Sequence, residues 1–482
     1  GVCWLRFSFC ILQIAQLSIL FLKGRKMFKK IVILSALCLL VSGCGGGSSN
    51  NDLVVDSTLC GNYGEMDAVP QSLKQNNIAI IKSLPANIGG VYYLQEILSN
   101  LQRFPGQRSL KRLDCEWNVV FEYAVDDNQS LIDFVEHPSG ELSLIIVSEE
   151  GHQLRRIDKD GALLGQLQIE GLSAPFNTGD VADLSESGED ILLAAKSNDL
   201  SVKLYRYQYT STGGFSYHWD TIVEPATSAF GWIMDGGSYD TFEQLAQPYQ
   251  VSLTTDPEGN AYVAVPGLAA LLLNHNEHFS ENLEFILHSD ERMNNWPQLD
   301  AIVTKISADG DRIYSVVGGT TYPDEIYGIT VFGESMYIFG RSTRQAGNFW
   351  DGFVTKMRTS SGEIEFSTLL DVQNGDIIYD LTELESGNLF AVGATNWTQN
   401  PLGFSVSENS EKLAVLLDDN GQLIDRYEVA DGERHNQLRS VTSLGNEWLL
   451  ISGFENGPGT HSGDNDSNLV RADGFLQTLA LP

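Results

Sequence analysis

The sequence predicts an all-β protein, a β-propeller of seven four-stranded blades. A short motif occurs twice, as D-A-I-V-T-K-I at residues 300–306 and as D-G-F-V-T-K-M at residues 351–357, a period of about fifty residues. Around it, short runs of alternating apolar and polar residues are joined by turns that contain glycine. Repeats of this length and content are typical of small antiparallel sheets arranged in a ring.

The first pair of strands in each blade is the clearest unit. It consists of an alternating run, a glycine turn and a second apolar run. The second pair follows with a tight turn such as Asp309-Gly310 or Asn420-Gly421. Copies of the first pair lie at residues 131–147, 181–195, 249–265, 327–340, 379–393 and 438–453. These copies predict six blades.

A seventh blade is predicted at residues 78–125, where the pattern is weaker. Residues 78–84 and 89–96 form one candidate hairpin, and residues 110–125 form the other. Residues 94–102 also fit a short helix, so six blades remain the alternative.

The D-x-F-V-T-K motif resembles the β-propeller repeat family found in many exported bacterial proteins. The segments 300–319 and 351–370 are close to its repeat, whereas the blades near residues 181, 249 and 411 depart from it. The resemblance implies the fold. It implies no shared activity, since this scaffold serves many functions.

Residues 27–44 resemble a bacterial lipoprotein signal peptide. A basic start at Met27 precedes a short apolar run and then V-S-G-C, which ends at Cys44. The resemblance implies cleavage before Cys44, acylation of that cysteine, and delivery to the outer membrane because Gly45 follows it. Four segments result: an upstream extension absent from the mature protein (1–26), the signal peptide (27–43), the lipidated cysteine with a flexible tether and N-terminal segment (44–77), and the propeller (78–482).

Cysteine and charge content restrict the setting further. If Cys44 carries lipid, Cys60 and Cys115 are the cysteines left in an oxidising compartment, and a disulfide between them is expected. The chain has 30 basic and 63 acidic residues, a formal net charge of −33. That charge argues against nucleic-acid binding, which needs a basic surface. The expected partners are the membrane, through the lipid, and a protein or glycan.

Long insertions are predicted on one face of the propeller. Turns within each strand pair lie on one face, while the longer connections fall on the other, at residues 225–248, 266–299, 342–350, 394–410 and 454–467. These connections contain candidate ligand-binding aromatic residues, Trp232, Trp296, Trp350 and Trp397. The alternative is that these rings pack the insertions onto the propeller. Trp117, Trp219 and Trp448 are expected in strands and in the core.

Catalytic and metal-binding signals are weak. Asp464, Asp466 and Asn468 have the alternating oxygen ligands of a calcium loop, but the glycine and distant glutamate of that loop are missing. His275, His278 and His288 lie in one insertion without a complete zinc pattern. We therefore expect no cofactor, with calcium as the alternative, and assign no catalytic residue. The sequence favours a binding protein over its alternative, a hydrolase or lyase acting on polysaccharide through carboxylates near the propeller axis.

Overall fold

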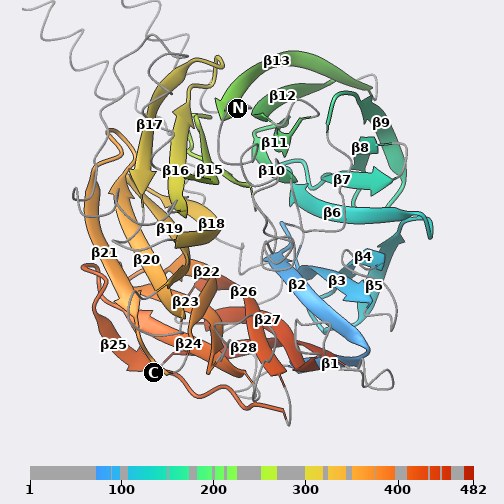
Figure 1. Ribbon diagram of the computed structural model, residues 1–482. Coiled ribbons are helices and arrows are strands. Elements are labelled where there is room, and N and C mark those ends of the chain that lie inside the picture. The colour runs from blue at the N-terminus through green and yellow to red at the C-terminus, as the bar shows by residue number, and fades with distance from the viewer. Residues whose placement is uncertain are drawn as a thin grey trace, which may run out of the picture. The chain divides into compact units, whose positions relative to one another are not determined.

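Figure 1 shows the computed structural model, which divides into Gly1–Ser49 and Asn50–Pro482. All described residues belong to the second unit. They comprise residues 72–87, 89–97, 107–148, 151–172, 182–197, 201–210, 214–224, 251–268, 299–318, 324–343, 350–373, 375–396, 410–432, 435–445, 448–457 and 472–481. Within these ranges every regular element is a strand. Across the same ranges, no helix has the length and apolar character needed to cross a membrane.

The described residues form seven antiparallel sheets of four strands each, which confirms the predicted seven-bladed propeller. Six sheets use consecutive strands, numbered here as blades 1 to 6. Blades 1 to 3 contain β2 (Ile78–Pro85), β3 (Val91–Ile97), β4 (Gln107–Leu113) and β5 (Val119–Ala124); β6 (Gln129–Glu136), β7 (Leu142–Ser148), β8 (Gly151–Ile157) and β9 (Leu163–Ile169); and β10 (Ala182–Ser187), β11 (Asp190–Lys196), β12 (Val202–Thr210) and β13 (Gly214–Glu224).

Blades 4 to 6 continue the pattern. They contain β14 (Ser252–Thr255), β15 (Ala261–Leu268), β16 (Leu299–Ile306) and β17 (Arg312–Gly318); β18 (Asp324–Phe332), β19 (Ser335–Thr343), β20 (Trp350–Arg358) and β21 (Ile364–Leu370); and β22 (Ile377–Glu383), β23 (Leu389–Thr395), β24 (Glu411–Leu417) and β25 (Leu423–Arg426). Figure 1 shows the first strand of each blade near the centre of the ring and the fourth at its rim.

Blade 7 joins the two ends of the propeller. Its strands are β26 (His435–Gly445), β27 (Trp448–Gly457), β28 (Asp473–Ala480) and, at the outer edge, β1 (Ser72–Asn76). β1 pairs with β28 from Ser72 opposite Gln477 to Asn76 opposite Asp473. The propeller therefore includes β1, which lies before the start at residue 78 that the sequence suggested. The weak seventh repeat forms blade 1, and residues 91–97 are a strand where a helix was the alternative.

Apolar packing between neighbouring blades holds the ring together. β23 is buried at all seven positions, whereas β25 at the rim is largely exposed. Seven apolar clusters each combine residues of two adjoining blades. One of them brings Ile80 and Tyr93 of blade 1 against Leu450 and Leu476 of blade 7. Each blade thus buries its two faces against its neighbours, and the seventh contact closes the circle.

The tight turns between third and fourth strands also pack against the preceding blade. Gly310 has a φ of +92°, and a Cβ there would lie 2.9 Å from the Trp219 ring. Trp219 and Trp448 pack at the edges of apolar clusters, as expected for residues in strands. Trp117 differs from the expectation: it lies in the turn between β4 and β5 with a φ of 65°, although its ring still packs against a cluster.

Candidate functional site

The inner strands carry a repeated irregularity. In β2, β6, β18 and β22 the pairing with the second strand skips one residue, a β-bulge, and in β26 it does so at three places. Such bulges turn side chains away from the regular alternation and are frequent beside functional sites. The skipped residues are Ile81, Ile132, Tyr327 and Tyr379, and in β26 they are Asn436, Arg439 and Leu444.

Polar side chains of the inner strands link several adjoining blades. The Leu184 N–H donates to Asp133 Oδ2 at 3.1 Å, and the Val441 N–H donates to Asp380 Oδ2 at 2.9 Å. In the same way Asp183 accepts from the Leu253 N–H at 2.7 Å. The inner edge of a propeller blade has no further strand to bond, so these side chains satisfy backbone donors that would otherwise be unpaired.

Five charged residues of the inner strands form an axial cluster: Lys82, Asp133, Asp183, Glu186 and Asp380. They interact electrostatically across blades 1, 2, 3 and 6. Lys82 Nζ lies 2.6 Å from Asp133 Oδ1, and it also donates to the Phe134 carbonyl. One lysine therefore faces four acidic residues in this cluster.

Protonation differs within the axial cluster. Burial raises the pKa of the Asp133 carboxyl, but Lys82 and a hydrogen bond with Asp183 outweigh it and the pKa is lowered. Burial and the adjacent Asp133 carboxylate hold the pKa of Asp183 well above its ordinary value. Burial also raises the pKa of Asp380 to about 6. The cluster thus places side by side two carboxyl groups whose pKa values are shifted in opposite directions, a pattern also found where general acid–base chemistry occurs.

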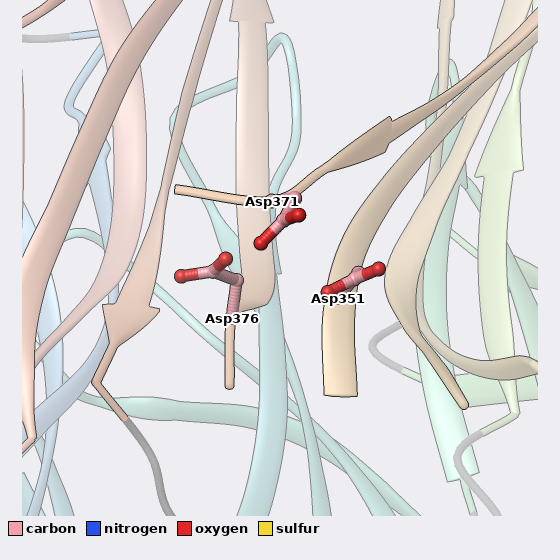
Figure 2. Close-up of side chains that lie close together, drawn as sticks. All are labelled: Asp351, Asp371 and Asp376. Atoms are coloured by element: carbon pink, nitrogen blue, oxygen red, sulfur yellow. The ribbon is translucent and has the colours of Figure 1, made fainter. Parts of the chain in front are cut away.

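A second acidic group lies between blades 5 and 6, where Figure 2 shows Asp351, Asp371 and Asp376 facing one another. One carboxylate oxygen from each of the three residues lies within 4.8 Å of those from the other two. In the part of the chain that the structure describes, this is the group of three histidine, cysteine or acidic side chains close enough to share a metal ion. Asp351 and Asp376 are buried, and Asp371 is exposed. Carboxylate oxygens at this spacing are donors that calcium accepts.

Hydrogen bonds of the fold explain the position of Asp376. Its carboxylate accepts from the Val372 and Gln373 N–H groups at 2.7 and 3.3 Å and from the Thr395 hydroxyl. Burial raises its pKa to about 6 despite these bonds. The carboxylate therefore connects the segment after β21 to the end of β23, and this function does not require an ion.

The acidic triad Asp351, Asp371 and Asp376 marks one face of the propeller. These residues lie at the start of β20, after the end of β21 and before the start of β22. We call the face where first and third strands begin the long-connection face. At this face 30 residues separate β15 from β16, and 27 separate β13 from β14. At the opposite face two residues, Gly333 and Glu334, separate β18 from β19.

Most residues predicted from the sequence to be functional lie outside the described ranges. They are Cys44, Cys60, Trp232, Trp296, Trp397, Asp464, Asp466 and Asn468. Trp350 is the first residue of β20, at the long-connection face as expected. Cys115 is disulfide-bonded, and its partner lies outside the described residues, so the pairing with Cys60 stays a prediction.

Sequence reasoning named no residue of the axial cluster, although its enzyme alternative placed carboxylates near the propeller axis, and it missed the acidic triad. A signal for the first was present, because an aspartate occupies the same inner-strand position at Asp133, Asp183 and Asp380. The triad had no such signal, since its members approach one another only when β20, β21 and β22 are in place.

No family model matches this chain, and no curated protein does. Solved structures with a related arrangement include Drosophila Plexin A in complex with Semaphorin 1b, at 10% identity and a TM-score of 0.44 over 86% of this chain and 88% of that one. The polysaccharide lyase Uly1 has 8% identity and a TM-score of 0.43 over 83% and 89%. A protein of unknown function from Bacteroides caccae has 12% identity and a TM-score of 0.35 over 73% and 93%. At these identities and scores, none of them bears on what this chain binds.

Proposed function

We propose that this protein is a non-enzymatic binding scaffold, a β-propeller that presents its long-connection face to a protein or glycan. The observation that carries the proposal is the difference between the two faces. At one face, strands are joined by connections as long as 30 and 27 residues. At the opposite face, β18 and β19 are joined by a turn of two residues. Long connections gathered on one side of a rigid scaffold are where binding residues concentrate.

The proposed setting is the outer membrane, with the propeller attached through a lipid on Cys44. The segment from Met27 to Cys44 supports it, since its order of basic, apolar and small residues resembles a lipoprotein signal. Metabolic labelling with an alkyne fatty acid tests it. We expect label on the intact protein and none on the Cys44→Ser variant, and equal label on both would exclude this anchor.

Binding is tested with a glycan array and with capture of envelope proteins by the intact protein. Alanine at Trp296, Trp350 and Trp397 should abolish a ligand found in this way if the long-connection face binds it. Asp419→Ala is the matched control, because Asp419 is exposed in the turn between β24 and β25 at the opposite face. Loss of binding in the control variant alone would place the ligand on the opposite face and contradict the proposal.

A second candidate function, hydrolysis or elimination of a polysaccharide, is favoured by one observation. The hydrogen-bonded Asp133 and Asp183 carboxyl groups have pKa values shifted in opposite directions, down and up. Against it, both groups accept backbone N–H donors of the neighbouring blade. Turnover of an acidic or neutral polysaccharide that disappears in Asp183→Asn, without loss of fold, would establish the enzyme and replace the scaffold proposal.

A further inference from the structure

Arg439 is an arginine whose setting the fold does not explain. It is the residue skipped by the bulge of β26 between Leu438 and Ser440. It is partly exposed, and its guanidinium carbon lies 4.0 Å from the centre of the Tyr379 ring and 5.8 Å from that of Phe454. The guanidinium group is therefore held in place by stacking on aromatic rings.

Among the described residues, Arg439 makes no ion pair and no hydrogen bond, and its buried Nε has no acceptor. Several other described arginines have carboxylate partners: Arg108 with Glu96, Arg156 with Glu141 and Glu189, Arg206 with Asp190, and Arg358 with Glu363 and Glu365. Arg155 and Arg312 instead donate to neutral oxygens, and the buried Nε of Arg112, like that of Arg439, has no acceptor. The chain has 63 acidic residues to supply such partners. A fixed guanidinium group without one is a prepared site for an external anion.

The neighbouring bulge residues extend this site. Tyr327 of blade 5 and Tyr379 of blade 6 meet edge to face at 5.1 Å between ring centres, and both are partly exposed. Arg341 lies 5.9 Å from the Tyr327 ring centre. An arc of four side chains thus runs over three adjoining blades, with two tyrosine rings between two arginines: Arg341, Tyr327, Tyr379 and Arg439. At the same bulge position, blades 1 and 2 have Ile81 and Ile132.

The arc lies toward the long-connection face. Tyr379 is the third residue of β22, and Arg341 is two residues from the end of β19. Both strand ends belong to that face, so a ligand bound to the scaffold's long connections would pass beside these side chains. This placement links the arc to the proposed binding function.

The chemistry of the arc selects among anions. A guanidinium fork pairs with a carboxylate in a planar geometry, and partly exposed tyrosine rings provide apolar surface for the C–H face of a sugar. An extended peptide would add to a free strand edge. The inner edge beside the arc is already occupied, because Asp380 accepts the Val441 N–H and Ser440 accepts the Ser83 N–H.

We propose that Arg439 and Tyr379 bind the carboxylate-bearing ring of an acidic sugar, a uronate, within a glycan held at the long-connection face. This inference rests on the proposed scaffold function and specifies its ligand class. Long-range repulsion by the net charge of −33 acts against a polyanion. Short oligosaccharides at physiological salt avoid most of it, since the screening length there is about 8 Å.

The test is calorimetric titration of the intact protein with trigalacturonate, its methyl ester and triglutamate. We expect the acid to bind and the methyl ester, which lacks the charge, to bind at least about tenfold more weakly. Arg439→Ala should weaken binding of the acid by about tenfold or more, and Arg439→Lys by less, since it keeps the charge but loses the fork. Arg358→Ala, an exposed arginine at the opposite face, should change binding less than about twofold.

Each of the other outcomes overturns either the uronate site, the scaffold function or both. Equal binding of the acid and its ester, or unchanged binding by Arg439→Ala and Arg439→Lys, overturns the uronate site while another glycan or protein at the long-connection face keeps the scaffold function. Preference for triglutamate overturns the sugar class in favour of an acidic peptide. Absence of any glycan or protein ligand overturns both proposals. Thermal unfolding of each variant separates loss of binding from loss of fold, and Arg439→Lys tests the site if the alanine variant does not fold.

Discussion

The axial cluster and the acidic triad are two groups of carboxylates in the same ring, and they differ in one component. The axial cluster contains Lys82, 2.6 Å from Asp133, and this cation lowers the pKa of Asp133 although the group is buried. In the triad, burial raises the pKa of Asp376 to about 6. Direct contact with Lys82 thus distinguishes Asp133, whose pKa is lowered, from Asp376, whose pKa is raised, and four predictions test that contrast.

The largest effect is expected from Lys82→Met. Removing the cation leaves Asp133 buried without its partner, which costs about 3 kcal/mol of unfolding free energy. The double variant with Asp133→Asn should recover part of the loss because neither charge then remains. Urea denaturation measures both, and a single variant as stable as the parent would show that Lys82 is not needed to keep Asp133 ionised.

A smaller and asymmetric effect is expected for the two hydrogen-bonded aspartates. The raised pKa of Asp183 favours its neutral form, which Asn resembles, so Asp183→Asn should cost less than about 1 kcal/mol. Asp133→Asn loses the ion pair with Lys82 and should cost about 2 kcal/mol. The same denaturation curves measure the difference; equal costs would mean that the proton is not held on Asp183.

The triad should make stability depend on pH. The pKa of Asp376 is about 6 in the fold against 3.8 ordinarily, so between these values the folded state binds more protons than the unfolded state. Its contribution is complete below pH 3.8 and is lost as the pH rises through about 6; the full loss is about 3 kcal/mol, of which about 2 kcal/mol falls between pH 4.5 and 7. Asp376→Asn should flatten this fall relative to the exposed control Asp371→Asn, as measured by urea unfolding at pH 4.5 and 7.

The smallest effect is expected from calcium. The hydrogen bonds that Asp376 accepts already fix that member of the triad without an ion. Calcium or a chelator should therefore move the melting temperature by less than about 1 °C. A rise of several degrees that vanishes in Asp371→Ala would instead show that the triad binds the ion.

The fold could be predicted from local patterns, because each hairpin carries its own alternation and turn residues. Blade 1 was predicted from a weak copy, and its buried residues Ile80 and Tyr93 show that packing supplied what the pattern lacked. The strand β1 could not be predicted as part of the ring, since its five residues gain their role from pairing with β28, about four hundred residues away.

The site was less predictable for a related reason. A recurring aspartate at Asp133, Asp183 and Asp380 is visible in the sequence, but its contact with Lys82 depends on how blades 1, 2, 3 and 6 meet at the axis. The same holds for Arg439, whose lack of an ion-pair partner among the described residues is a property of the folded ring. The tryptophans that the sequence favoured lie mostly outside the described residues, so their role in binding stays a prediction.

The pairing of β1 with β28 has a consequence for the order of assembly. The strand Ser72–Asn76 is made first, yet its partner Asp473–Ala480 is made last, so the outer edge of blade 7 stays incomplete during the whole of synthesis. Blades 1 to 6 have all their own strands earlier. The pairing of β28 with β1 therefore completes blade 7 and closes the ring last. A chain that stops short of residue 473 would leave an unpaired strand edge available to other chains.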